Sequence, residues 1–290
     1  MVAKKKILVT GGAGFIGSNL IEQLVKEEVN EVYSLDNYST GSKSNHINGA
    51  SYIEGDTLDI AKLVKIKPDL LFHLGEYARV EKSFEDMRKV WHSNKDGTFA
   101  VLEFARANKV KLVYAGSSTK FGDGGLGRDQ SPYAWTKASN TELVKNYGAW
   151  FDLKYAITYF YNVYGPREIS TGGFATVIGI FKEKKKTGNP LSVVSPGTQA
   201  RIFTHVDDIV RGLIVVGEKG VGDGYGLGAN DEYSILDIAK LFGGKILMLP
   251  ERPGNRMSSA IDLSRSRDEL GWRAEKSIKK YIEEFIALLQ

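Results

Sequence analysis

Apolar runs and amphipathic stretches alternate along the first half of the chain. Short apolar runs predict strands at residues 7–10, 31–35, 52–56, 69–74, 111–115 and 155–161. Between them, apolar positions recur at helical spacing and predict helices at 18–27, 59–65, 90–108 and 133–150. Strands that alternate with helices in this way favour an α/β fold, in which helices cover both faces of a parallel sheet.

The second half of the chain has a looser pattern. Helices are predicted at 174–186, 207–216, 235–241 and 278–289, and a further strand at 245–249. Strands at 191–194 and 200–204 flank Pro196-Gly197-Thr198-Gln199, a turn sequence that predicts a hairpin-type connection. The glycine-rich residues 220–228 are interpreted as a surface turn. We therefore expect a smaller, mixed α/β domain after the parallel sheet.

A glycine-rich turn follows the first predicted strand. Gly11 permits the tight turn, Gly14 lets a pyrophosphate approach the backbone, and Gly17 lets the next helix pack against the strand. The second predicted strand ends at Asp36, whose carboxylate can bind an adenosine ribose and would repel a 2′-phosphate. The next residue is Asn37 rather than an arginine that could bind such a phosphate. The pattern predicts a doubly wound, Rossmann-type sheet that binds NAD rather than NADP.

A second cluster of polar residues follows the strand at 111–115. Ser117, Ser118 and Thr119 come first, and Tyr133 and Lys137 then lie one helical turn apart. An ammonium beside a phenol favours the phenolate, so Tyr133 could exchange protons near neutral pH. Taken alone, the pair also fits an amphipathic helix with one packed aromatic and one solvated lysine. Ligands bind at the carboxyl edge of parallel strands, and this context favours a proton-transfer site beside the cofactor.

Composition and charge narrow the classes of protein. Hydrophobic residues at 42% and charged residues at 26% are typical of a soluble globular enzyme. The absence of cysteine excludes disulfides and thiolate metal sites, and it fits a reducing cytoplasm. No signal peptide and no run long enough to span a membrane are present. The net charge of +4 is too mild to indicate nucleic-acid binding, and the histidines lack metal-ligand spacing, so no metal site is expected.

Motifs along nearly the whole chain carry a family resemblance. They are TGGAGFIGSNL (10–20), GDTLD (55–59), FHLG (72–75), NKDGT (94–98), SPYAWTK (131–137), NVYGPR (162–167), RIFTHVDD (201–208), ERPGN (251–255) and LGW (270–272). In these motifs the chain resembles the extended short-chain dehydrogenase/reductase family, in its NAD-dependent nucleotide-sugar epimerase/dehydratase branch (UDP-glucose 4-epimerase-like). The resemblance implies an NAD-binding domain at 1–165 that carries the Ser/Tyr/Lys site, and a nucleotide-sugar-binding domain at 166–290. The chain is expected to cross back to the sheet around 200–235.

The resemblance also assigns roles to residues. Tyr133 would take the proton from a sugar 4-hydroxyl, Ser117 would bind the reacting oxygen, and Lys137 would bind the nicotinamide ribose. The residues expected to bind the cofactor are Gly11, Gly14, Phe15, Ile16, Gly17, Asp36, Asn37, Asp56, Thr57, Leu74, Gly75, Asn94, Tyr133 and Lys137. Those expected to bind the substrate are Ser117, Ser118, Thr119 and, on its diphosphate, Asn162, Arg201 and Arg252. A homodimer through the helices at 90–108 and 133–150 is also implied.

Two positions help to select the reaction. Family dehydratases carry Asp-Glu directly after the hydroxyl residue, where this chain has Ser118 and Thr119, and neither of these can remove a C5 proton. Dehydration is therefore disfavoured unless another carboxylate substitutes, and Glu76 is the candidate. The loop from Phe121 to Pro132 is shorter than is usual in the branch, which leaves the identity of the sugar open. His205 lies in a family motif, and we interpret it as structural rather than catalytic.

Three functions remain open at this point. The first is an NAD-dependent nucleotide-sugar 4-epimerase that works through a transient 4-keto sugar. The second is a nucleotide-sugar or nucleotide-heptose 4-dehydrogenase or reductase with net redox change. The third is a non-catalytic NAD-binding protein, which would have no reason to keep Ser117, Tyr133 and Lys137 together.

Overall fold

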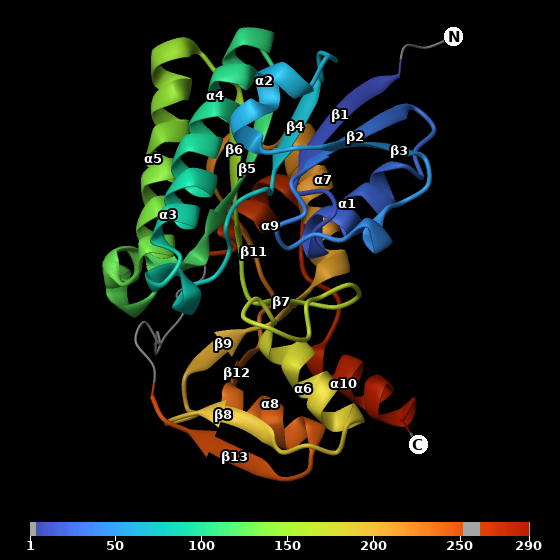
Figure 1. The fold of residues 1–290 in the computed structure, drawn as a ribbon, viewed down its shortest axis with the longest axis vertical. Helices are drawn as coiled ribbons and strands as arrows, with labels where there is room; N and C mark the ends of the chain where they lie inside the picture. Colours follow the sequence, from blue (N-terminus) through green and yellow to red (C-terminus); the bar gives the residue numbers. More distant parts are fainter. Residues whose placement is uncertain (1–3, 252–261, 290) are drawn as a thin grey trace.

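The central element of the fold is a parallel sheet. The structure, a computed structural model, describes residues 4–251 and 262–289, and in this part of the chain seven parallel strands lie in the order β11-β6-β5-β4-β1-β2-β3 (Figure 1). They are β1 (Lys5–Thr10), β2 (Asn30–Asp36), β3 (Ala50–Glu54), β4 (Leu70–His73), β5 (Lys111–Ser117), β6 (Tyr155–Phe160) and β11 (Gly222–Leu227). The strand order reverses between β1 and β4, where ligands bind in open α/β sheets. The predicted doubly wound, Rossmann-type α/β fold is confirmed.

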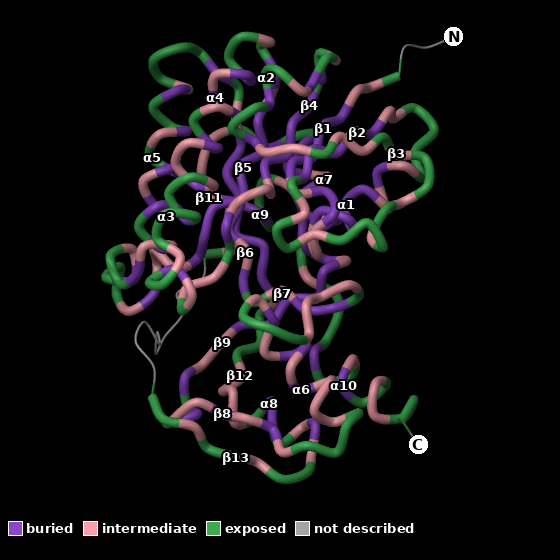
Figure 2. Tube along the Cα trace, in the orientation of Figure 1, coloured by how far each residue is buried: buried purple, intermediate pink, exposed green. Residues whose placement is uncertain are grey.

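Helices cover both faces of this sheet because its strands are apolar on both sides. Along β1, Leu8 faces one cluster of buried side chains, while Ile7 and Val9 face the other. On the first face lie α2 (Ile60–Leu63), α4 (Gly97–Asn108) and α5 (Pro132–Phe151), and on the second lie α1 (Phe15–Leu24), α7 (Val206–Lys219) and α9 (Ser264–Leu270). Figure 2 shows the buried strands between these two helical layers.

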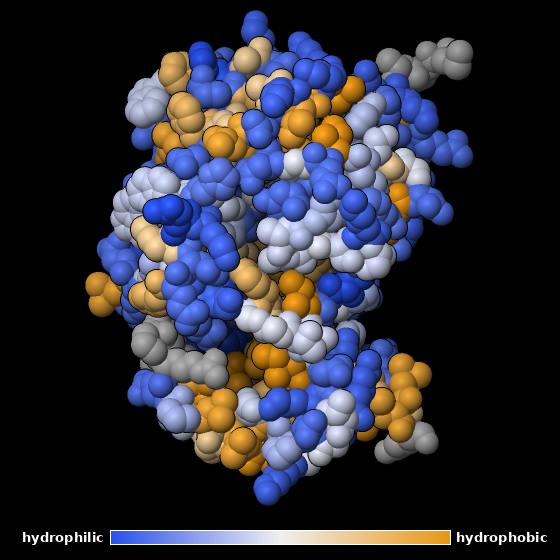
Figure 3. Space-filling model, viewed as in Figure 1, coloured by the Kyte–Doolittle hydropathy of each residue, from blue (hydrophilic) through white to orange (hydrophobic). Residues whose placement is uncertain are grey.

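A smaller lobe has its own core. It contains α6 (Val177–Lys186), α8 (Ile235–Phe242) and α10 (Ile278–Ala287), with the strand pairs β8 (Leu191–Val194)/β13 (Ile246–Leu249) and β9 (Ala200–Ile202)/β12 (Glu232–Ser234). Phe181, Ile238, Phe242 and Ile282 form the centre of its core, and none of them is exposed. A short pair, β7 (Val163–Tyr164) with β10 (Thr204–His205), lies between the lobes, where Figure 3 shows the molecule narrowing.

The predicted hairpin around Pro196 is wrong. β8 pairs in parallel with β13, and β9 pairs antiparallel with β12, so the two strands that flank the turn do not pair with each other. The turn residues do end one strand and begin the next. The partners of both strands come from later in the chain, and the local sequence carries no information about them.

The predicted surface turn at 220–228 is also wrong. Residues Gly222–Leu227 form β11, which pairs in parallel with β6 at the edge of the main sheet. Tyr225 and Leu227 point inward and are buried against α7. The alternation typical of a strand was not recognised, because glycines occupy every second position and only Tyr225 and Leu227 carry apolar side chains.

The helix predicted at 90–108 is longer and less regular. It begins with α3 (Met87–Val90), continues as a π-helical segment, Trp91–Asp96, and then becomes α4. The remaining helical turns are short 3-10 segments at Lys43–Asn45, Thr57–Asp59, Glu81–Phe84, Ser118–Phe121 and Asp123–Asp129. His205 precedes α7, and its Nδ1 accepts a hydrogen bond from the Asp207 amide at 3.1 Å, so it caps that helix. Within residues 4–251 and 262–289, no helix has the length and apolarity to cross a membrane.

Candidate functional site

The glycine-rich turn between β1 and α1 leaves no room for a side chain at Gly11 or Gly17. Gly11 has a φ of +73°, and a Cβ there would lie 2.8 Å from the Cα of Gly75, which follows β4. A Cβ on Gly17 would overlap the Gly11 carbonyl oxygen. No side chain in the described chain caps the N-terminus of α1, so its first amides remain available to an anion. These residues fit the pyrophosphate of a dinucleotide.

Asp36 ends β2 beside this turn. Its carboxylate is buried and accepts hydrogen bonds from the amides of Ala13 and Tyr38, both at 2.8 Å. The neighbouring Asn37 donates to Asp56 Oδ2 at 2.9 Å. The carboxylate and the Asn37–Asp56 pair therefore stand side by side at the carboxyl ends of β2 and β3. This arrangement fits an adenosine, with a ribose at Asp36.

One cavity of about 540 Å³ connects this region to Tyr133 and Lys137. Thirteen of the residues expected to bind the cofactor line it, namely Gly11, Gly14, Phe15, Ile16, Gly17, Asp36, Asn37, Asp56, Thr57, Leu74, Gly75, Tyr133 and Lys137. Asn94 does not line it. Its side-chain oxygen accepts from the Tyr77 amide at 2.7 Å and its nitrogen donates to the Tyr77 carbonyl at 3.1 Å, so Asn94 holds the segment after β4 in place.

The structure brings Ser117 and Tyr133 into contact. β5 runs two residues beyond the predicted strand and ends at Ser117. α5 starts at Pro132, and the Ser131 hydroxyl caps it by accepting from the Ala134 amide at 3.1 Å. The Tyr133 hydroxyl then donates to Ser117 Oγ at 3.2 Å, and Ser117 Oγ also lies 2.8 Å from Thr119 Oγ1. A hydroxyl thus contacts a phenol, and the phenol, Tyr133, lines the cavity.

Lys137 lies behind this pair and is almost fully buried. Its ammonium donates to the Glu76 carboxylate and to the Ala115 carbonyl, and it lies 4.5 Å from the centre of the Tyr114 ring. Burial lowers the pKa of Lys137, and Glu76 opposes that effect. Burial, the largest single effect, would raise the pKa of Glu76. The charge of Lys137, with smaller contributions from His73 and from the hydrogen bonds of Lys137 and Thr98, together outweighs burial and lowers that pKa. The two groups form a buried ion pair beside Tyr133.

A strap formed by residues 165–176 contributes Ile169, Phe174 and Thr176 to the cavity wall. Three side chains hold the strap in place. Arg167 Nη2 donates to Glu22 (2.6 Å) and Asn19 (2.8 Å) of α1. Glu168 accepts from Thr176 within the strap (2.6 Å) and from Lys182 of α6 (3.3 Å), and Arg79 Nε donates to the Gly173 carbonyl (3.1 Å). The role of the strap and of Arg79 in the cavity wall was not found from the sequence, although the strap begins within the NVYGPR motif, because the sequence does not show which parts of the molecule the strap contacts.

Two of the three residues expected on the substrate diphosphate, Asn162 and Arg201, are described in the structure and lie close to each other in sequence-distant segments. Asn162 donates to the Ile202 carbonyl at 2.9 Å, which places it next to Arg201, and Arg201 Nη1 donates to the Ala200 carbonyl at 2.7 Å. Neither lines the cavity described above. Arg252 lies outside the described residues. In the described part of the chain, no group of three or more histidine or acidic residues could hold a metal ion.

The site and the fold agree with comparisons to known proteins. The sequence profile of the NAD-dependent epimerase/dehydratase family matches residues 7–228. A putative UDP-glucose 4-epimerase of Methanocaldococcus jannaschii is 29% identical over 97% of both chains, and the dTDP-glucose 4,6-dehydratase of Salmonella typhimurium is 27% identical over 98% of this chain and 94% of its own. The structure of Thermus thermophilus UDP-glucose 4-epimerase with NAD superposes with a TM-score of 0.88 at 26% identity, covering 98% of each chain. The glycine-rich turn, Asp36, Tyr133 and Lys137 line one cavity, and Ser117 contacts Tyr133. The chain belongs to the NAD-dependent epimerase/dehydratase family and uses NAD as its cofactor.

Proposed function

We propose that the protein is an NAD-dependent nucleotide-sugar 4-epimerase in which Tyr133 is the acid and base. The observation that carries the proposal is the hydrogen bond from Tyr133 to Ser117, with the Lys137 ammonium behind it, on the cavity that begins at the glycine-rich turn. A sugar hydroxyl placed against these two oxygens can pass its proton to Tyr133 while Ser117 donates to the same oxygen.

The chain's own residues divide the work. The Gly11–Gly17 turn and Asp36 would hold the cofactor, whose nicotinamide would supply a reversible acceptor for the 4-hydride. Tyr133 as a phenolate takes the 4-hydroxyl proton and gives it back after the sugar has turned over. Ser117 holds the reacting oxygen between the two steps. Asn162, Arg201 and Arg252 would hold the diphosphate, around which the sugar turns.

The distribution of carboxylates supports epimerisation over dehydration. Ser118 and Thr119 occupy the positions at which a dehydratase would need an acid and a base. Glu76 is the nearby carboxylate that could substitute, but it is enclosed and accepts from Lys137, Thr98 and Tyr114. A carboxylate held in that way has no free oxygen to direct at a sugar C5 proton.

The strap supports an internally recycled cofactor over net redox turnover. Its ties to α1, α6 and Arg79 hold it at the cavity wall, where it would slow the exchange of a bound cofactor. An enzyme that released a 4-keto product would have to exchange NADH for NAD in every cycle. A retained cofactor is compatible with the epimerase cycle, in which none is consumed.

The proposal is tested by incubating the purified protein with UDP-, GDP-, CDP- and ADP-sugars and following products by NMR. We expect one sugar to be converted into its 4-epimer with no net change in NADH absorbance and without added NAD. Stoichiometric NADH formation would favour the 4-dehydrogenase instead. Retained, protein-bound NAD with no conversion of any substrate would favour the non-catalytic alternative.

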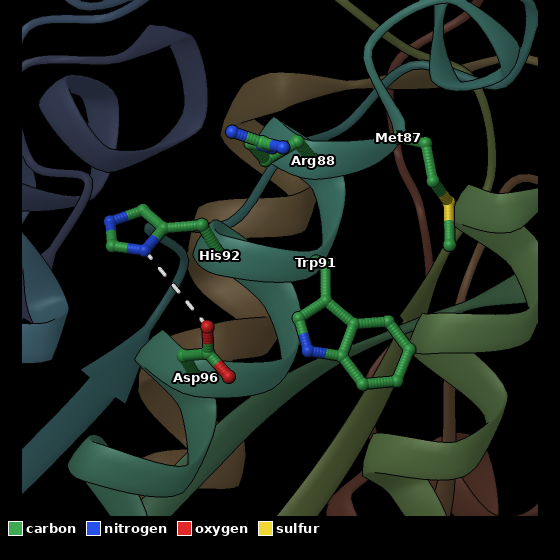
Figure 4. A pocket seen from close by; sticks show the side chains of 5 residues that line it. All are labelled: Met87, Arg88, Trp91, His92 and Asp96. Carbon is green, nitrogen blue, oxygen red and sulfur yellow. Dashed lines mark ion pairs between the residues drawn. The ribbon is translucent and has the colours of Figure 1, made fainter.

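We also propose a homodimer through the helices around Trp91 and Trp135. These two rings stack with centroids 6.0 Å apart, yet they are 42% and 38% exposed. Figure 4 shows Met87 and Trp91 on one side of their helix, with His92 and Asp96 on the other. Further exposed apolar side chains in this region are Phe84, Met87, Phe99, Trp150 and Phe151. Large exposed aromatic patches are typical of interaction surfaces.

Replacing Trp91 with glutamate is therefore expected to dissociate the dimer. Loss of a buried interface tryptophan costs about 2 kcal/mol or more, which raises the dissociation constant roughly 30-fold. Light scattering after size exclusion, over a dilution series, measures this change. Val221→Glu serves as the control, because Val221 is 69% exposed at the start of the β11 segment, away from these helices. A monomeric wild-type protein would contradict the proposal.

A further inference from the structure

Glu76 is a buried carboxylate to which the mechanism above gives no role. It lies just after β4, and its side chain is 3% exposed. Its Oε1 accepts from Thr98 Oγ1 at 2.9 Å, Asn140 Nδ2 at 3.0 Å and the Tyr114 hydroxyl at 3.1 Å, while its Oε2 accepts from Lys137. Donors from α4, α5 and β5 thus converge on one side chain that lines the edge of the reaction cavity.

The hydrogen-bond network favours an ionised carboxylate, because the Lys137 ammonium and Asn140 Nδ2 can only donate to it. Because the Thr98 hydroxyl donates to Glu76, its oxygen accepts from His73 Nε2 at 3.0 Å. His73 Nδ1 then accepts from Thr10 Oγ1 at 2.7 Å, and Thr10 in turn accepts from the Gly75 amide at 3.1 Å. Burial lowers the pKa of His73 to about 4, so this ring is neutral and has one proton to donate. A protonated Glu76 would bring an extra donor into a network that already supplies all of them.

We propose that Glu76 is a positioning residue that acts through Lys137. Its carboxylate holds the Lys137 ammonium beside the Ala115 carbonyl and offsets its charge, and it thereby sets the pH range in which Tyr133 exchanges its proton. The proposal rests on the proposed function in one respect, the role of Tyr133 as acid and base.

The other ionisable groups around Lys137 leave Glu76 as its counter-charge. Burial keeps His73 of β4 neutral, and it raises the pKa of Tyr114 of β5 so that this phenol stays protonated. Lys95, from the π-helical segment, donates to Ser139 and Asn140 on the far side of the network, and Arg79 approaches Tyr133 from the strap side of the cavity. Among the described residues that face Lys137, Glu76 is the carboxylate in contact with it.

The sign of the effect follows from the net charge of the buried group. With Glu76 ionised, Lys137 and Glu76 sum to zero, so loss of a proton from the Tyr133–Lys137 pair leaves a net negative charge. With glutamine at position 76, the same loss converts a net positive site into a neutral one. The first deprotonation therefore moves to lower pH in the variant, whichever of the two residues releases the proton.

The test compares Glu76→Gln, Glu76→Asp and Tyr114→Phe with the wild type. For Glu76→Gln we expect the acid limb of the pH–rate profile to move to lower pH, with kcat at the wild-type optimum reduced roughly tenfold by the displaced lysine. Glu76→Asp keeps the charge but shortens the side chain, so kcat should fall while the acid limb of the pH–rate profile stays at the wild-type pH. Tyr114→Phe removes one donor to the carboxylate and leaves the charge, so the limb also stays.

A second readout needs no substrate. Tyrosinate absorbance is titrated in Glu76→Gln and in Glu76→Gln/Tyr133→Phe, and the difference isolates Tyr133. We expect the midpoint of this difference titration to lie at lower pH than the midpoint of the difference between the wild type and Tyr133→Phe. The proposal would be overturned if the Tyr133 titrations in the wild-type and Glu76→Gln backgrounds coincided and the acid limb of the Glu76→Gln pH–rate profile did not move. If Glu76→Gln does not fold, a moved acid limb in Glu76→Asp or Tyr114→Phe overturns it, and a reduced rate with an unmoved limb in Glu76→Asp supports it. Failure of the proposed function appears separately, as absence of turnover in the wild type.

Discussion

Replacing Tyr133 with phenylalanine is expected to lower kcat by roughly 10²–10⁴-fold, the range that a positioned acid and base contributes. The change removes the hydroxyl that donates to Ser117 at 3.2 Å and leaves the ring in the cavity wall. Because the glycine-rich turn and Asp36 are untouched, we expect the variant to retain NAD. Mass spectrometry of cofactor released on denaturation measures this retention, and product NMR measures the turnover.

The matched control is the same substitution about four turns further along the same helix. Tyr147 also lies on α5, but its hydroxyl donates to Glu103 at 2.7 Å in the helical layer, outside the cavity. Tyr147→Phe should keep full turnover and lose about 1 kcal/mol of unfolding free energy with that hydrogen bond. If Tyr133→Phe turned over substrate as fast as Tyr147→Phe, Tyr133 would not be the acid and base.

The parts of the fold that could be predicted are those whose signal is local. β1, β4 and β5 are buried on both faces, so their sequences are continuous apolar runs. The spacing of the glycines predicts the tight turn after β1. β11 was missed because glycine supplies half of its residues, and its place in the sheet depends on β6, far earlier in the chain. The predicted pairing of β8 with β9 was wrong for the same reason, because the true partner of each strand follows only after a long connection.

In the site, too, residues with a local sequence signal could be predicted, and contacts between distant residues could not. Ser117, Tyr133 and Lys137 could be named because each follows a strand end or a helix start at a recognisable spacing. The role of Glu76 could not, since its donors come from Thr98, Tyr114, Lys137 and Asn140, and the sequence does not show that these side chains meet. Asn94 stays a predicted cofactor residue. The sequence does not show that its amide also holds the backbone of Tyr77.

Replacing Lys137 with methionine is expected to abolish turnover and to destabilise the fold by about 3–5 kcal/mol near neutral pH, because it removes one partner of a buried ion pair. Glu76 would keep its neutral donors but lose the ammonium that holds its pKa down. The loss should depend on pH. In the wild type the lowered pKa of Glu76 contributes stability above the ordinary value of 4.5, and this contribution disappears as the pH falls through the lowered value. In the variant, burial raises that pKa, so the deficit relative to the wild type grows as the pH rises above 4.5 and shrinks toward acid.

Urea unfolding at about pH 5 and about pH 8 measures this difference. The matched control is Lys95→Met, since the Lys95 ammonium donates to Ser139 at 3.0 Å and Asn140 at 2.8 Å, with no buried carboxylate as its partner. It should cost about 1 kcal/mol with little dependence on pH. The double variant Lys137→Met/Glu76→Gln removes both charges and should regain more than half of the stability lost at the higher pH, without regaining turnover. If the double variant is as unstable as Lys137→Met, or if Lys95→Met is equally costly, the ion pair is not what stabilises this part of the molecule.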